Sequence, residues 1–116
     1  MALSIMSERH GRVMVSRLVG EFDQQSAVLV RDTLEQAILV ESIDHLVLNL
    51  SGLTFMDSTG IGVLLGRYKQ ITQRGGRIVV CGLSPTIARL FELSGLSKIM
   101  IIAPSEEDAL QVLGVA

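Results

Sequence analysis

The chain has 116 residues, of which 48% are hydrophobic, and its formal net charge is −2. That length suits one domain with one hydrophobic core. The near-even charge balance, without a basic block, argues against nucleic-acid binding through phosphate contacts. The first ten residues lack the apolar run of a signal peptide, and no stretch reaches the length of a membrane span. We therefore expect a cytoplasmic protein.

The first half of the chain opens with two strands joined by a turn at His10-Gly11. A stretch with helical spacing follows, in which Val30 and Leu34 fall on one apolar stripe. The expected elements are strands Leu3–Met6 and Arg12–Gly20, a helix over Gln24–Val40 and a strand His45–Leu50.

The second half alternates helices and strands. The expected elements are a helix Ser58–Arg74, a strand Arg77–Cys81, a helix opened by Ser84-Pro85 and closed by Gly95, a strand Lys98–Ile102, and a last helix opened by Ser105-Glu-Glu-Asp108. The whole order predicts an α/β fold. Its sheet is mainly parallel and five-stranded, with one antiparallel N-terminal strand and four helices.

The lone cysteine and the two histidines predict no special chemistry. Cys81 ends an apolar run and is expected to be buried, without a disulfide partner. His10 and His45 have no cysteine or carboxylate neighbours at metal-ligand spacing, so we expect both to be solvated. These observations predict neither a metal nor a cofactor.

Two loops follow the carboxyl ends of strands, where ligands and partners bind in sheets of this kind. They span Gly20–Gln25 and Ser51–Gly60. Since both leave the same end of the domain, we expect Asp23, Asp57 and Ser58 to lie near one another.

Ser58 stands where a strand gives way to a helix. It is either a plain helix N-cap or a phosphate acceptor, because a helix N-terminus has free N–H groups and a favourable dipole for an anion. Asp57 suits a loop or capping role better than that of a catalytic base. Asp23 could equally be the N-cap of the first helix.

The glycines at 60, 62 and 66 do not form a phosphate-binding motif. Leu65 occupies the last glycine position of a dinucleotide fingerprint, and no Walker loop or G-x-S-x-G nucleophile elbow is present. Gly62 and Gly66 favour close helix packing at i, i+4. The alternative is a flat helix face left open for a partner.

A phospho-acceptor receiver domain is a rival interpretation, because it also has an aspartate at the end of its third strand, as Asp57 is here. It requires an acidic pair after the first strand and a lysine after the fifth. No acidic pair lies beside Leu3–Met6, and Lys98 precedes the last strand. A small enzyme or nucleotide-binding domain is the other alternative.

Several blocks spread over essentially the whole chain are recognisable together. They are Gly20-Glu-Phe-Asp23, Leu46-Val-Leu-Asn-Leu50, Phe55-Met-Asp-Ser-Thr-Gly-Ile-Gly62, Leu65-Gly-Arg-Tyr-Lys-Gln70, Gly76 with Val80-Cys81, Leu90-Phe91 with Ser94-Gly95-Leu96, and Leu113-Gly-Val-Ala116. With these blocks the chain resembles the anti-sigma factor antagonists of the STAS domain family, and most of all the sporulation members.

The resemblance implies a partner-switching phosphoprotein in transcription regulation, and not an enzyme. In this family the unmodified protein binds an anti-sigma factor, which is also a serine kinase, and so frees the sigma factor. The kinase inactivates the antagonist by phosphorylating the serine that aligns with Ser58, and a serine phosphatase reverses this. The implied docking residues are Glu21, Asp23, Asp57, Ser58, Thr59, Gly60 and Gly62. No DNA or membrane contact is implied, and we expect a monomer when the protein is free.

Three positions depart from the close relatives. Thr59 stands where they have serine, and Gln24-Gln25 stand where they have two histidines. Thr59 keeps a hydroxyl and so leaves a second acceptor open on chemical grounds. The family has been proposed to bind purine nucleotides weakly, but no motif in this sequence supports that.

Overall fold

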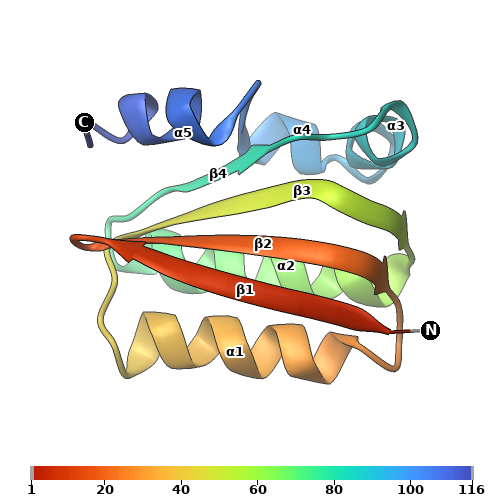
Figure 1. Ribbon diagram of the computed structural model, residues 1–116, viewed down its shortest axis with the longest axis horizontal. Helices are drawn as coiled ribbons and strands as arrows, with labels where there is room; N and C mark the ends of the chain where they lie inside the picture. The colour runs from red at the N-terminus through yellow and green to blue at the C-terminus, as the bar shows by residue number, and fades with distance from the viewer. Residues whose placement is uncertain (1, 116) are drawn as a thin grey trace.

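The computed structural model describes residues 2–115, which form one five-stranded sheet flanked by helices (Figure 1). The strands lie in the order β1-β2-β3-β4-β5, with β1 antiparallel to β2 and every other neighbouring pair parallel. The elements are β1 (Leu3–His10), β2 (Val13–Phe22), α1 (Ala27–Leu39), β3 (His45–Met56), α2 (Ser58–Gln73), β4 (Ile78–Cys81), α3 (Pro85–Ser94), α4 (Leu96–Ile99), β5 (Ile101–Ala103) and α5 (Glu106–Val112). The predicted α/β fold and its sheet are confirmed.

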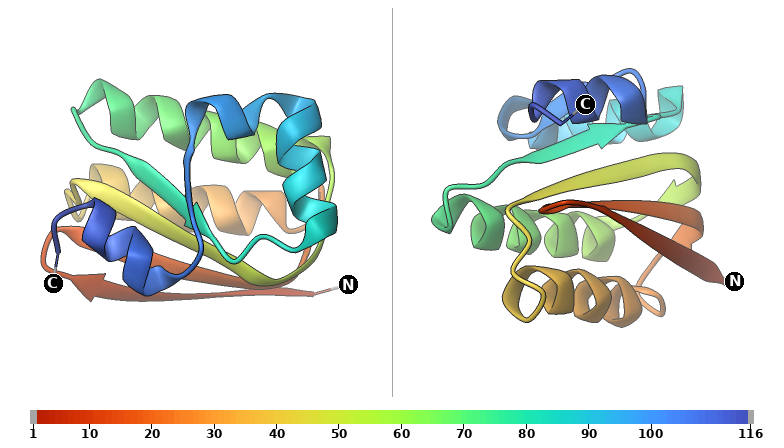
Figure 2. Two further views of the ribbon diagram at one scale, coloured as in Figure 1. Left: turned by 90° about the horizontal axis from the view of Figure 1, so that it is seen from above. Right: turned by 60° about the vertical axis from the view of Figure 1, so that its left-hand side comes forward.

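The strands alternate their side chains between two apolar layers, as the two-residue period of a strand requires. Leu46 and Leu48 belong to the larger cluster, which α1 to α4 cover. Val47, Val79 and Cys81 belong to the smaller cluster, which α5 covers. Figure 2 shows α2 and α5 on opposite sides of the sheet. Cys81 is buried as predicted, and this burial raises its thiol pKa to about 11.

The first hairpin is longer than its apolar pattern indicated. Pairing runs from Leu3↔Gly20 to His10↔Val13, so the turn consists of Gly11 and Arg12. The apolar pattern does not indicate the second half of β1, because β1 is an edge strand and its polar side chains there face solvent. Pairing with β2 supplies the register instead.

β3 is the largest departure from the sequence-based prediction. It was expected to end at Leu50, but it continues to Met56 beside the equally extended end of β2. Ser51-Gly52 resembles a strand terminator. In the fold, however, a Cβ on Gly52 would lie 2.8 Å from Cγ2 of Val19, so glycine permits the two strands to approach at a register shift.

The segment after Gly95 also differs from the prediction. Residues 96–99 form the short helix α4, a fifth helix among the described residues, and β5 begins only at Ile101. Gly95 adopts the left-handed conformation with φ of 85°, and Leu96 and Met100 turn into the core. A helix of one turn leaves no periodicity for a pattern to detect.

Hydrogen bonds, as well as its apolar face, hold α5 to the sheet. Glu106 receives two hydrogen bonds from Arg17, at 2.7 and 2.8 Å, and one from Asn49 at 2.7 Å. These three hydrogen bonds join β2, β3 and the start of α5. The hydrogen bonds from Arg17, and to a smaller extent the bond from Asn49, lower the pKa of the Glu106 carboxyl.

The three glycines near the start of α2 have different surroundings. A Cβ on Gly60 would lie 2.7 Å from Cγ of Met56 and 3.1 Å from Cγ of Phe22, whereas nothing lies within 4 Å of such an atom on Gly62 or Gly66. The packing interpretation of Gly62 and Gly66 is therefore wrong. Their helix face is open, and Gly60 is the packing glycine.

A pair of alanine substitutions tests this assignment. Gly60→Ala should lower the free energy of unfolding by about 1–3 kcal/mol, because its methyl group overlaps the side chains of Met56 and Phe22. Gly66→Ala should raise it by up to about 1 kcal/mol, because alanine favours an open helix position over glycine. Urea unfolding curves measure both. The same sign for the two variants would contradict the assignment.

Candidate functional site

The two loops of interest come together at the carboxyl ends of β2 and β3. Phe22 is the register partner of Met56, and the backbone N–H of Asp57 donates to the carbonyl of Phe22 over 3.2 Å. Asp23 follows the first of these strands, and Asp57 with Ser58 follows the second. The expected juxtaposition of the two segments is thus present, at the right-hand end of the sheet in Figure 1.

Asp57, rather than Ser58, is the N-cap of α2. Its Oδ1 accepts hydrogen bonds from the backbone N–H of Thr59 at 2.9 Å and of Gly60 at 3.3 Å. The interpretation of Ser58 as N-cap is therefore wrong. Ser58 is the first helical residue, one position further along, because the carboxylate outcompetes the hydroxyl for the free N–H groups.

The two neighbouring hydroxyl groups differ in their engagement. The Thr59 hydroxyl donates to Oδ1 of Asp57. The Ser58 side chain is exposed, and its hydroxyl makes no hydrogen bond to any residue between 2 and 115. Of the two hydroxyl groups at this helix end, that of Ser58 is therefore the one available to react.

Asp23 shapes the neighbouring loop instead of capping α1. Its Oδ1 accepts from the backbone N–H groups of Gln25 and Ser26, each at 3.0 Å. These bonds form a turn, so α1 begins at Ala27 and not at Gln24, with Ser26 in the N-cap position. Asp23 as N-cap is thus corrected.

Ser26 is a structural residue that the sequence interpretation missed. Its buried hydroxyl donates to the carbonyl of Glu21 over 2.9 Å and accepts from the backbone N–H of Asp23 over 2.9 Å. It thereby ties the segment that carries Glu21 and Asp23 to the start of α1. A serine directly before an apolar helical stripe was the available signal.

Both aspartates of the site are held in their charged form. The hydrogen bond from the Thr59 hydroxyl, followed by those from the backbone N–H groups of Gly60 and Thr59, lowers the pKa of the Asp57 carboxyl. Hydrogen bonds from Ser26 do the same for Asp23. At neutral pH the two adjoining loops therefore carry two carboxylates, Asp57 directly before Ser58 and Asp23 on the neighbouring loop.

The residues expected on the docking face differ in how exposed they are. Ser58, Thr59 and Gly62 are exposed, and Glu21, Asp23 and Asp57 are half-buried. Gly60 is buried on the inner side of the first turn of α2, against Met56 and Phe22, so it shapes the site without offering a contact surface.

The histidines lie at the other end of the sheet, since His10 and His45 both neighbour Val13 in register. His45 is half-buried, and its Nδ1 accepts from the Arg77 backbone N–H at 3.0 Å, so the expectation that it is solvated is corrected. Neither ring stands beside Ser58 as a base. Within residues 2–115 no cluster of three metal-ligating side chains occurs, and no helix is long and apolar enough to cross a bilayer.

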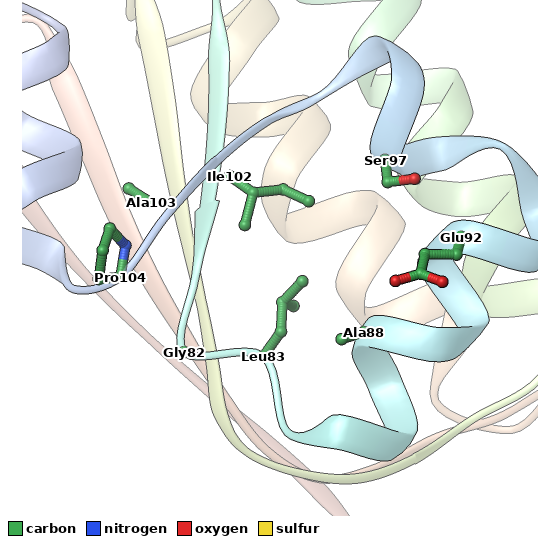
Figure 3. Close-up of a pocket in the computed structure, with 8 residues that line it drawn as sticks. All are labelled: Gly82, Leu83, Ala88, Glu92, Ser97, Ile102, Ala103 and Pro104. Carbon is green, nitrogen blue, oxygen red and sulfur yellow. The ribbon is translucent and has the colours of Figure 1, made fainter.

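A hollow of about 410 Å³ lies elsewhere, between the ends of β4 and β5 and the helices α3 and α4 (Figure 3). Its lining is mostly apolar, with the Glu92 carboxylate and the Ser97 hydroxyl as the polar side chains, and it contains no lysine or arginine. A cavity of this kind does not favour the phosphates of a nucleotide.

Comparison with known proteins connects this site to a family. The model of the STAS domain family matches residues 4–109. The anti-sigma F factor antagonist of Paenibacillus polymyxa is 46% identical over 115 residues, which cover 99% of this chain and 98% of that protein.

Two solved structures of the anti-sigma factor antagonist SpoIIAA are similar over nearly the whole chain. The unphosphorylated form has a TM-score of 0.84 at 32% identity, covering 97% of this chain and 99% of that one. The phosphorylated form, from Bacillus, has a TM-score of 0.77 at 32% identity, with coverages of 95% and 99%. The chain therefore belongs to the STAS domain family, with anti-sigma factor antagonists as its full-length relatives.

Proposed function

We propose that this protein is an anti-sigma factor antagonist of the sporulation type. Its unphosphorylated form binds an anti-sigma factor that is also a serine kinase, and binding releases the sigma factor. Phosphorylation of Ser58 by that kinase switches the antagonist off, and a serine phosphatase restores it. The protein acts in the cytoplasm, without contacting DNA and without chemistry of its own.

One observation carries this proposal. Ser58 offers an exposed, unengaged hydroxyl at the first turn of α2, on a chain whose full-length relatives are antagonists of this kind. The adjoining hydroxyl of Thr59 is already bonded to Asp57. Phosphorylation of SpoIIAA, seen in one of its structures, gives the modification a precedent in a relative.

The open face of α2 supports docking beside the acceptor. Gly62 lies one turn after Ser58 and Gly66 two turns after it, and neither carries a side chain to hold a partner away. A kinase or another protein surface can therefore approach the backbone of α2 closely.

The switch follows from the charge already present. A phosphate adds about −1.5 to −2 charges at neutral pH. The fold tolerates this addition at a helix N-terminus, where the dipole favours an anion. The partner does not tolerate it, because an unpaired charge buried in an interface costs several kcal/mol and the carboxylates of Asp23 and Asp57 add repulsion. No refolding is required.

Mass spectrometry after incubation with the cognate anti-sigma kinase and ATP identifies the acceptor. We expect one phosphate, on Ser58, and none on Thr59. The variant Thr59→Val serves as the control, since it removes the second hydroxyl and should still be phosphorylated. Phosphate found mainly on any residue other than Ser58 would refute the assignment.

Substitutions at residue 58 test whether charge is the switch. Ser58→Ala should escape phosphorylation and bind the kinase within about twofold of wild type, because its side chain makes no hydrogen bond that the fold would lose. Ser58→Asp should bind at least about tenfold more weakly, with the loss limited because it carries less charge than phosphate. Calorimetric titration measures both, and thermal melts check the fold. Equal affinity of the two variants would exclude the proposed mechanism.

Gly62→Gln tests the open helix face. The glutamine side chain meets nothing within the domain, so the free energy of unfolding should stay the same or rise slightly. It should nevertheless weaken kinase binding by about tenfold or more, because it occupies the space a partner needs. Lys69→Gln is the matched control, because it places the same side chain at an exposed position further along α2. Gly75 would be a poor control position, because its positive φ disfavours any residue other than glycine. Wild-type affinity for Gly62→Gln would place docking elsewhere.

A further inference from the structure

A second surface borders the phosphoacceptor end of the molecule. A groove of about 350 Å³ runs between the end of β3 and the helix α3. Its apolar lining is formed by Phe55 and Met56 on the strand side and by Ile87, Leu90 and Leu93 on the helix side, and Arg89 lines it as well. Nothing in the proposed switch mechanism uses this groove.

Two large apolar side chains stand open to solvent on opposite walls. Phe55 is 46% exposed and Leu93 is 72% exposed. Single exposed apolar residues need no explanation, but two that face one concave surface are typical of an interface core.

The strand side of the groove has a free edge. β3 pairs with β4 only from Leu46↔Ile78 to Asn49↔Cys81, whereas β3 itself continues to Met56. Along that extension β2 is its neighbouring strand within the described chain. The extension thus projects past β4 and presents its outer side to the groove and α3.

Met56 connects the groove directly to the phosphoacceptor. Its side chain lines the groove, and its Cγ lies where a Cβ on Gly60 would come within 2.7 Å, so it also supports the first turn of α2. Phe55 and Met56 immediately precede Asp57 and Ser58 in the chain. The groove therefore adjoins the segment that carries Ser58.

Arg89 defines the chemistry of the occupant. Its side chain is exposed and forms no ion pair with any residue between 2 and 115, although it stands beside the groove. An apolar side chain in the groove followed by a carboxylate would satisfy both features.

We propose that the groove between β3 and α3 is an anchoring site for the same anti-sigma kinase that docks at Ser58, filled by an apolar side chain of the kinase with a carboxylate beside it. This inference rests on the proposed function. The groove contributes affinity and is separate from the charge switch, because Ser58 is not among the residues that line it.

The test is calorimetric titration of the unphosphorylated protein with the cognate anti-sigma kinase. Leu93→Ser and Arg89→Glu should each raise the Kd about tenfold. Both side chains are exposed, so thermal melts should match wild type. Val40→Ser and Arg74→Glu are the controls. Val40 is 74% exposed at the end of α1, Arg74 follows α2, and both lie at the opposite end of the sheet. Both controls should bind within about twofold of wild type.

Other outcomes separate the two proposals. If Leu93→Ser and Arg89→Glu bind like wild type while Ser58→Asp binds weakly, the anchoring site is wrong and the proposed function stands. If the wild-type protein does not bind the kinase, the proposed function fails, and the anchoring site fails with it. If sedimentation shows a dimer of this chain that Leu93→Ser dissociates, the occupant is a second copy and the proposal is overturned.

Discussion

The site depends on the parallel register that carries the ends of β2 and β3 forward together. The hydrogen bond from the Asp57 N–H to the Phe22 carbonyl closes this register, and Gly60 lets the first turn of α2 rest against Phe22. Without that close approach α2 would start further from the loop of Asp23. The Ser58 hydroxyl, the carboxylates of Asp23 and Asp57 and the strand side of the groove all take their positions from this contact.

Asp57 has two roles that are usually assigned to different residues. As the N-cap it satisfies the N–H groups of Thr59 and Gly60, and through the same bonds it remains ionised. The fold thus fixes a negative charge beside an uncommitted hydroxyl. The helix end is therefore satisfied without the Ser58 hydroxyl, which stays free of hydrogen bonds to residues 2–115.

α2 packs its inner face tightly against the core, whereas its outer face includes two glycines, Gly62 and Gly66, with no neighbour beside them. Leu64 and Ile71 are fully buried on the inner face. Arg67 is buried too, with its side chain only 9% exposed and 3.5 Å from Glu35 of α1. Burial lowers the pKa of its guanidinium. An arginine reads as polar in any sequence pattern, so its burial follows only from how closely α1 and α2 pack.

The sequence by itself determined the sheet, its one antiparallel strand, the burial of Cys81 and the nearness of the two loops, because apolar runs and helical spacing are local signals that tertiary packing reinforces here. It also carried the family resemblance, in contiguous blocks. Only the tertiary structure decided that Asp57 caps α2, that a Cβ would meet open space at Gly62 and Gly66 but not at Gly60, and that β3 reaches Met56. Each of these depends on which groups a distant segment brings within reach: competing hydroxyl and carboxylate acceptors, the space beside a missing Cβ, and the hydrogen-bond partner that a neighbouring strand supplies. The spacing of residues along the sequence does not indicate which distant segments will become such neighbours.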